Sequence, residues 1–216
     1  MSNHSDIHVA LASNNGYVVL MAALIKSIEQ NHHTQQNIVF YLLSDNISKS
    51  NQDKIALSVK DSPQIILKWI EAQNVFPPNI KFPEDKSAFP KTAYLRLFAP
   101  ALVEKGVKKL IYFDVDMIVK SDISELWDID LQGFTMAAVL DVGKTVGCLW
   151  GGIPNYKQLG LPADAKYFNS GLMIIDCEKW VAENIPQKVF KAMDDNIEYV
   201  NYADQYGLNV VLHKTG

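Results

Sequence analysis

Short apolar runs alternate with amphipathic stretches over the first third of the chain. Ile7–Ala12, Ile38–Leu43 and Gln64–Trp69 are rich in aliphatic and β-branched residues and lie next to turn-forming residues, which is typical of buried strands. Between the first two runs, Tyr17–Glu29 has apolar residues at helical spacing. Ser48 follows the second run and is a suitable N-cap for another helix. This βαβαβ order with short connections predicts a parallel sheet of the nucleotide-binding type.

The rest of the chain continues the alternation less regularly. A proline-rich stretch ends near Lys91, and beyond it we expect helices over Thr92–Leu102 and Asp176–Phe190. Three apolar runs predict further strands, and these are Lys108–Phe113, Phe134–Leu140 and Phe168–Ile175. No internal repeat, low-complexity tract or obvious linker divides residues 1–216. We therefore expect one α/β domain with a mostly parallel central sheet flanked by helices.

Composition and charge narrow the class of protein. Of the 216 residues, 48% are hydrophobic and 20% are charged, as in ordinary globular chains. The net charge of −4 argues against a nucleic-acid-binding protein, which normally presents a basic face. The N-terminus lacks the residue order of a signal peptide, and the longest purely apolar run, Val18–Ile25, is too short to span a bilayer. Cys148 and Cys177 have no metal-ligand spacing, and we expect Cys177 to be reduced and buried. These features predict a cytoplasmic protein.

The strongest chemical signal is an apolar run, Lys109–Phe113, that leads into Asp114-Val115-Asp116. In an extended chain, Asp114 and Asp116 would point to one side and Val115 to the other. Two carboxylates at the end of a buried strand repel each other unless a cation lies between them or one is protonated. Oxygen ligands of this kind suit Mg²⁺ or Mn²⁺, and open α/β sheets bind ligands at the carboxyl ends of their strands. A purely structural role is the alternative for this pair.

Other acidic pairs and another class of enzyme compete with this interpretation. Asp128/Asp130 and Asp176/Glu178 have the same spacing, and we expect them in a turn and at a helix start. Phosphatases of the haloacid dehalogenase type also place Asp-x-Asp after an apolar strand and use the first Asp as nucleophile. Those enzymes normally carry the motif near the N-terminus and need a later acidic pair after another apolar strand. Here the motif lies mid-chain and the later Asp-Asp follows a helix-like segment, which disfavours that class.

Six motifs follow one another along almost the whole chain. They are Leu11–Tyr17, Thr92–Leu97, Leu110–Val119, Leu126–Asp128, Tyr167–Asp176 and Tyr202–Leu212. Singly each is of weak to moderate specificity, but their joint order and spacing resemble glycosyltransferase family 8. That family contains bacterial lipopolysaccharide galactosyl- and glucosyltransferases and glycogenin-like proteins. The first motif is similar to the family's uridine-binding turn, the third to its metal-binding strand, the fifth to its sugar-site strand and the last to its Asp-Gln helix.

The resemblance implies a GT-A type fold and a retaining transfer of galactose or glucose from a UDP-sugar, with Mn²⁺ (or Mg²⁺) held by Asp114 and Asp116. It implies nucleotide contacts from Ala12, Ser13, Asn14, Asn15, Tyr17, Arg96, Asp114, Val115 and Asp116. Tyr17 would stack on uracil, and the Asn14 side-chain carbonyl would accept the uracil N–H. Arg96 would bind the diphosphate or a sugar hydroxyl. The structural alternatives are a core aromatic at a helix start for Tyr17 and a surface salt bridge for Arg96.

The resemblance also implies a sugar site formed by Arg96, Asp141, Asn169, Asp204 and Gln205, with Asp141, Asp204 and Gln205 as its catalytic group. Asp141 would reach the donor sugar, and Asn169 and Asp204 would hydrogen-bond sugar hydroxyls. Gln205 would lie under the anomeric carbon and stabilise positive charge there through its amide oxygen. The structural alternatives are a turn cap for Asp141, a turn for Asn169, a helix N-cap for Asp204 and a surface polar residue for Gln205.

Family members carry a later His-x-x-Gly-x-x-Lys-Pro-Trp segment that supplies a His to the metal and a Lys to the diphosphate. His213 follows Asp204-Gln205 too closely for that role, so we expect it to end the Asp-Gln helix. We expect this segment to be absent and metal binding to be weak if the chain is complete at Gly216. The alternative function is a degenerate or truncated nucleotide-sugar-binding protein. The expected partners are a UDP-sugar and a glycan or protein acceptor, such as lipopolysaccharide or another cell-surface glycoconjugate, and a longer form would be able to associate peripherally with a membrane.

Overall fold

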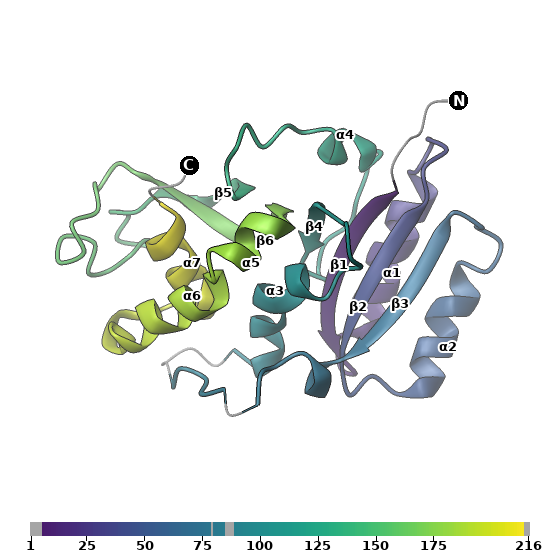
Figure 1. Cartoon of the computed structure of the whole chain (residues 1–216), viewed down its shortest axis with the longest axis horizontal. Coiled ribbons are helices and arrows are strands. Elements are labelled where there is room, and N and C mark those ends of the chain that lie inside the picture. The colour runs from purple at the N-terminus through teal and green to yellow at the C-terminus, as the bar shows by residue number, and fades with distance from the viewer. Residues whose placement is uncertain (1–5, 79, 85–88, 214–216) are drawn as a thin grey trace.

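The sheet at the centre of the molecule has six strands in the order β3-β2-β1-β4-β6-β5 within the residues that the computed structural model describes, 6–78, 80–84 and 89–213 (Figure 1). The strands are β1 (Ile7–Asn14), β2 (Ile38–Asp45), β3 (Ile65–Glu71), β4 (Lys109–Phe113), β5 (Met136–Thr145) and β6 (Lys166–Asp176). The first four are parallel, whereas β6 is antiparallel to both β4 and β5. The predicted α/β fold with a mostly parallel sheet is therefore confirmed.

Helices cover both faces of this sheet. The α-helices are α1 (Val18–Gln30), α2 (Lys49–Ser58), α3 (Leu95–Phe98), α4 (Ser124–Trp127), α5 (Cys177–Ala182), α6 (Ile185–Asp194) and α7 (Ala203–Leu212). Short 3₁₀ segments are η1 (Ala72–Asn74), η2 (Lys91–Tyr94), η3 (Ala99–Ala101) and η4 (Ile197–Tyr199). One core packs under α1, α2 and α4, and the other under α3, α5, α6 and α7. None of the helices in the described ranges is long and apolar enough to cross a membrane.

Side chains that alternate along β1 contribute to both hydrophobic cores. Ile7, Val9 and Leu11 enter the core under α1, whereas Ala10 and Ala12 enter the opposite one. All of these side chains are buried, as expected for a parallel strand covered on both faces. The two alanines are small where α3 lies against β1, which allows the α3 backbone to approach the sheet closely. Arg96 of α3 is thereby placed beside the carboxyl ends of the central strands.

Two of the predicted helices are interrupted. The segment predicted as one helix over Thr92–Leu102 is a series of short turns, η2, α3 and η3, and Pro100 lies in the last of them. The segment Asp176–Phe190 divides into α5 and α6 at Asn184, whose left-handed backbone (φ 52°) ends α5, and Pro186 follows in the first turn of α6. Propensity favoured continuous helices here, but the proline and the left-handed residue decide the local geometry.

The predicted capping and burial are confirmed at several positions. The Ser48 side chain caps α2 by accepting the Asn51 backbone N–H at 3.3 Å. Asp176 caps α5 by accepting the Lys179 backbone N–H at 2.9 Å, as expected for an acidic residue at a helix start. Cys177 is buried and free, and burial raises the pKa of its thiol to about 12. His213 lies at the end of α7, where a ring nitrogen is 2.9 Å from the Val210 carbonyl oxygen.

Candidate functional site

A cavity of about 250 Å³ opens at the carboxyl ends of β1 and β4. Its lining is Ala12, Ser13, Asn14, Tyr17, Phe89, Pro90, Thr92, Ala93, Arg96, Tyr112, Asp114, Val115 and Asp116. Every residue that the sequence predicted as a nucleotide contact lines this cavity except Asn15. The fold therefore brings the first turn, the arginine of α3 and the Asp-x-Asp segment to one place, as a nucleotide site requires.

Two aromatic side chains in the cavity remain largely exposed. Tyr17 precedes α1 and is 57% exposed, so the alternative of a core aromatic at the helix start is wrong. Phe89, from the proline-rich stretch, is 53% exposed. Exposed ring faces in a cavity suit stacking on a planar base. Sequence reasoning missed Phe89 because its segment has no periodicity that would indicate where its side chains point.

The two asparagines of the first turn hold the turn itself. The Asn14 Oδ1 atom accepts backbone N–H groups from Gly16 at 2.8 Å and Tyr17 at 3.3 Å. The Asn15 Oδ1 atom accepts the Ser48 backbone N–H and the side-chain amide of Asn51, both at 3.0 Å. The oxygen that was expected to accept a uracil N–H is therefore engaged within the turn, and Asn15 joins this turn to the start of α2.

The Asp-x-Asp segment departs from the expected extended geometry. β4 ends at Phe113, and Asp114–Asp116 form a turn, so the predicted alternation of the two carboxylates with Val115 along a strand is wrong. Both carboxylates nevertheless line the cavity. Asp116 is exposed, whereas Asp114 is partly buried and accepts the Tyr112 hydroxyl at 3.0 Å. Its backbone N–H bonds to the Gly171 carbonyl oxygen at 2.7 Å, which ties this turn to β6.

Arg96 joins the cavity to the C-terminal part of the chain. Its side chain is buried. Nη1 lies 3.2 Å from Asp114 Oδ2 and Nη2 lies 3.1 Å from Asp114 Oδ1. Nε lies 3.2 Å from Asp204 Oδ2. Burial by itself would lower the pKa of Arg96, but the charges of Asp204 and Asp114 raise it, so the guanidinium stays charged. The alternative of a surface salt bridge for Arg96 is therefore wrong, and so is that of a helix N-cap for Asp204, which lies buried within α7 while Tyr202 occupies the N-cap position.

Asp141, Asn169 and Gln205 form a second group of contacts, at the edge of β5, β6 and α7. Asp141 Oδ2 accepts the side-chain amides of Asn169 and Gln205, both at 3.0 Å. Burial disfavours the charge of Asp141, but the hydrogen bonds from Asn169 and Gln205 outweigh it and lower the pKa. Asp141 therefore stays ionised at neutral pH. Asn169 lies within β6 and Gln205 is a partly buried member of this group, so the alternatives of a simple turn and a surface polar residue are wrong.

Three further residues hold this arrangement and were not predicted. Ser170 contacts both Arg96 and Gln205. Its carbonyl oxygen and its hydroxyl accept hydrogen bonds from Arg96 Nη1 at 3.0 and 3.2 Å, and its backbone N–H donates to Gln205 Oε1 at 3.1 Å. Asn209 bonds to the N–H and C=O of Phe168 and ties α7 to β6. The Tyr167 hydroxyl lies 3.3 Å from Gln205 Nε2. The i,i+4 spacing of Gln205 and Asn209 on one helix face was the available sequence signal.

The geometry around Asp114 fits a hard divalent cation. A carboxylate has about four lone-pair positions, so the contacts to Arg96 and Tyr112 leave Asp114 able to accept more, and Asp116 is exposed in the same cavity. Gly171 leaves room for this carboxylate, because a Cβ there would come within 2.8 Å of Asp114 Oδ2. Mg²⁺ and Mn²⁺ accept one or two carboxylates and complete their shell with phosphate and water oxygens. Among the described residues, no cluster of three or more acidic, His or Cys side chains adds a further ligand.

Comparison with known proteins identifies the family. The model of glycosyl transferase family 8 matches residues 8–215, and the chain belongs to this family. General stress protein A of Bacillus subtilis (strain 168) is 28% identical over 219 residues, which cover 99% of this chain and 71% of that protein. Lipopolysaccharide 1,2-glucosyltransferase of Escherichia coli (strain K12) is 27% identical over 207 residues, 95% of this chain and 58% of that protein. The chain thus spans about three fifths to seven tenths of these two relatives.

Solved structures show the same fold. The crystal structure of the galactosyltransferase LgtC in complex with donor and acceptor sugar analogs has a TM-score of 0.76 and 24% identity to this chain, covering 95% of it and 70% of LgtC. At this identity the likeness shows the fold rather than the activity. The predicted GT-A type fold is confirmed, as is the family that the six motifs indicated.

Proposed function

We propose that this chain transfers galactose or glucose from a UDP-sugar to a glycan acceptor with retention at the anomeric carbon. The observation that carries the proposal is a continuous line of contacts between the cavity and the Asp141 group. Asp114 contacts Arg96, Arg96 contacts Ser170, and Ser170 contacts Gln205. A nucleotide in the cavity would direct its diphosphate toward Arg96 and its sugar toward Asp141 and Gln205. Membership of family 8 supports the same activity.

On the nucleotide side, the protein binds the parts of UDP with different groups. Tyr17 and Phe89 would stack on the base, and the ring faces need no hydrogen-bond partner to do so. Asp114 and Asp116 would hold Mn²⁺ or Mg²⁺, which supplies Lewis-acid stabilisation of the departing diphosphate. Arg96 orients Asp114, because its two Nη atoms contact both carboxylate oxygens.

On the sugar side, the groups are already oriented by one another. Asp141 is ionised and fixed by amide donors, so it would accept a sugar hydroxyl without rearrangement. The Gln205 amide is held at both ends, by Asp141 at Nε2 and by the Ser170 N–H at Oε1. Its oxygen carries partial negative charge and would stabilise the positive charge that develops at the anomeric carbon. Asp204, paired with Arg96, would complete recognition of the hydroxyls.

The acceptor proposal rests on the relatives rather than on the site. One similar protein is a lipopolysaccharide 1,2-glucosyltransferase, which favours lipopolysaccharide or another cell-surface glycoconjugate as acceptor. A cytoplasmic location, where UDP-sugars are made, stays a prediction.

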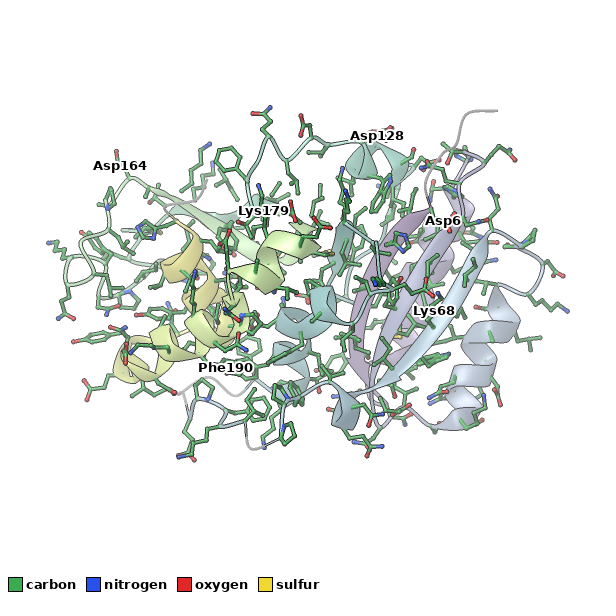
Figure 2. The ribbon with its side chains drawn as sticks, in the orientation of Figure 1. Asp6, Lys68, Asp128, Asp164, Lys179 and Phe190 are labelled. Carbon is green, nitrogen blue, oxygen red and sulfur yellow. The ribbon has the colours of Figure 1, made fainter. Side chains whose placement is uncertain are left out.

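The proposal is tested by hydrolysis of UDP-galactose and UDP-glucose in the presence of Mn²⁺. We expect Asp116→Ala and Asp114→Ala each to lower the rate by at least ~100-fold, because charge on the leaving diphosphate is then poorly stabilised. The matched control is Asp128→Ala, an exposed acidic residue of the other Asp-x-Asp pair, which lies on a different surface segment (Figure 2). Activity that survives both substitutions and is indifferent to a chelator would contradict the mechanism.

The second candidate is nucleotide-sugar binding without transfer. It is favoured by the absence of a third metal ligand from the part of the chain that the structure describes. Titration calorimetry with UDP and Mn²⁺, followed by the hydrolysis assay, separates the two. Binding without turnover supports this candidate, and turnover excludes it.

A further inference from the structure

The connection between β5 and β6 places an apolar rim next to the Asp141 group. Asp141 Oδ1 accepts the Gly143 backbone N–H at 3.3 Å, and a Cβ on Gly143 would lie 3.1 Å from the Trp150 carbonyl oxygen. On the other side, the Asn201 side-chain amide donates to the Gly152 carbonyl oxygen at 2.9 Å. Asn201 precedes α7, the helix that carries Gln205. Residues 148–152 are therefore packed between the element that carries Asp141 and the element that carries Gln205.

This turn is closed at its base and displays apolar side chains at its tip. Val146 and Ile153 are buried, and the Ile153 N–H bonds to the Val146 carbonyl oxygen at 2.8 Å. Gly152 is required there, because a Cβ would come within 2.3 Å of that same carbonyl oxygen. Between these anchors, Leu149 is fully exposed and Trp150 is 68% exposed.

Exposed apolar side chains continue around the turn. Tyr202 is 37% exposed, and its ring lies 3.9 Å from the position of a Cβ on Gly151. We call Leu149, Trp150 and Tyr202 the acceptor rim. Neighbouring exposed apolar side chains on an anchored turn are typical of a surface that binds a ligand or partner. In Figures 1 and 2 the β5–β6 connection, with Asp164 labelled on it, forms the end of the molecule farthest from β3 and α2.

We infer that the acceptor rim is a binding subsite for a pyranose ring of the acceptor glycan, with Trp150 as its stacking platform. The inference rests on the proposed function, which places the anomeric carbon of the donor beside Asp141 and Gln205. An acceptor hydroxyl must reach that carbon, so the acceptor must pass over the neighbouring side chains. A sugar ring presents C–H groups on its faces and hydroxyls at its edge. A flat indole matches the face, and the Trp150 backbone lies against Gly143, two residues from Asp141, so the rim adjoins the donor-sugar site.

The test uses the fluorescence of Trp150. The chain has four tryptophans, of which Trp127 and Trp180 are 9% and 1% exposed, so the difference between wild type and Trp150→Phe isolates the exposed indole. Lactose, maltose and cellobiose are titrated with and without UDP and Mn²⁺, and anionic phospholipid vesicles are titrated separately. We expect at least one disaccharide to shift the Trp150 emission to shorter wavelength and to protect it from acrylamide.

Kinetics give the second readout. For a disaccharide that wild type accepts, Trp150→Ala should lower the ratio of transfer to hydrolysis by about tenfold, which corresponds to a contact of about 1.4 kcal/mol. Trp150→Tyr keeps an aromatic ring at this position and should restore most of the ratio. The matched control is Phe134→Ala, which removes an exposed aromatic (44%) near the start of β5, away from Asp141, and should alter neither signal.

Each outcome decides the inference separately from the proposed function. If no disaccharide affects Trp150 while UDP-sugar hydrolysis is intact, the rim is not an acceptor subsite and the proposed function stands. If only vesicles shift the emission, the rim is a lipid contact and the inference is overturned. If wild type hydrolyses no UDP-sugar, the proposed function fails, but the sugar titration without nucleotide still shows whether the rim binds a pyranose.

Discussion

The two sides of the proposed site, called the nucleotide side and the sugar side, are built in different ways. On the nucleotide side, formed by β1–β4 with α1 and α3, Tyr17, Phe89 and Asp116 point into an open cavity and are largely exposed. On the sugar side, formed by β5, β6 and α7, Asp141 and Gln205 contact each other and their neighbours through directed hydrogen bonds. The nucleotide side therefore depends on its ligand to complete it, whereas the sugar side is oriented before any ligand arrives.

Arg96 is the contact that joins the two sides. Its guanidinium lies between Asp114 of the first and Asp204 of the second, and its Nη1 also bonds to Ser170 of β6. The Tyr112 ring lies against the same guanidinium, 5.1 Å from its Cζ atom. If the two sides are coupled, a change at Arg96 should damage both, and a change elsewhere should damage one.

The largest expected effect is that of Arg96→Met. It leaves the buried carboxylate of Asp204 without its cation, and removing one partner of a buried ion pair costs on the order of 3–5 kcal/mol of the free energy of unfolding. Urea denaturation measures this loss, and UDP-sugar hydrolysis should fall with it. The control is Lys191→Met, which breaks the exposed pair with Asp195 and should cost at most ~0.5 kcal/mol. A loss as small as that of the control would mean that Arg96 does not join the two sides energetically.

The next effect in size tests the sugar side alone. Gln205→Ala removes the amide that contacts Asp141 and Ser170, and we expect turnover to fall by roughly 10²–10³ while the affinity for UDP, a property of the other side, stays unchanged. Steady-state kinetics and calorimetry give the two values. Gln158→Ala, an exposed glutamine bonded to Tyr199, serves as control. A matching loss of UDP affinity would show that the two sides are not separable.

The same contrast explains what the sequence could predict. On the nucleotide side, the apolar run before Asp114 indicated a ligand site at the carboxyl ends of the strands, and the resemblance to a family added the turn before Tyr17. Asn14 and Asn15 show the limit, because the hydrogen bonds that their side chains make within the turn and to Ser48 were not predicted. The interruption at Asn184 depends on a left-handed residue that no periodicity indicates.

On the sugar side, the resemblance named candidate residues, but the sequence did not indicate how they contact one another. Asp141, Asn169 and Gln205 are far apart along the chain, and only the resemblance to a family placed them together. Ser170 contributes through its backbone N–H and C=O as well as its hydroxyl. Because every residue has these backbone groups, the residue type does not indicate this role. The antiparallel pairing of β6 with β4 brings Ser170 beside Arg96. This pairing depends on tertiary packing, and the local sequence pattern does not determine it.

A smaller effect is expected on the nucleotide side. Tyr17→Ala and Phe89→Ala should each weaken UDP binding by about 1–2 kcal/mol, because each removes a ring face that would stack on the base. Calorimetry with UDP should show this, and turnover at saturating UDP-sugar should change little. Phe134→Ala is the matched control, as an exposed aromatic outside the cavity. If Tyr17→Ala alone weakens binding, Phe89 lines the cavity without touching the base.

The smallest effect concerns acid stability and the segment that follows Asp116. Asp122 accepts the His33 backbone N–H at 2.5 Å and the Ser124 backbone N–H at 2.9 Å, and its Oδ1 lies 3.3 Å from the His32 ring. Burial opposes ionisation of Asp122, but these hydrogen bonds outweigh it and lower the pKa from 3.8 to about 2. The charged carboxylate thereby fastens this segment to the end of α1.

Because the folded pKa lies below the ordinary value, the stabilisation is present above about pH 4 and is lost as the pH falls toward 2. Allowing for solvent screening, it should amount to on the order of 1–2 kcal/mol. Asp122→Asn should therefore be less stable than wild type in urea at pH 6, and the difference should vanish near pH 2. Asp128→Asn, an exposed neighbour, should show no such dependence. A difference that persists unchanged at pH 2 would mean that the packing of Asp122, and not its charge, holds this segment to the end of α1.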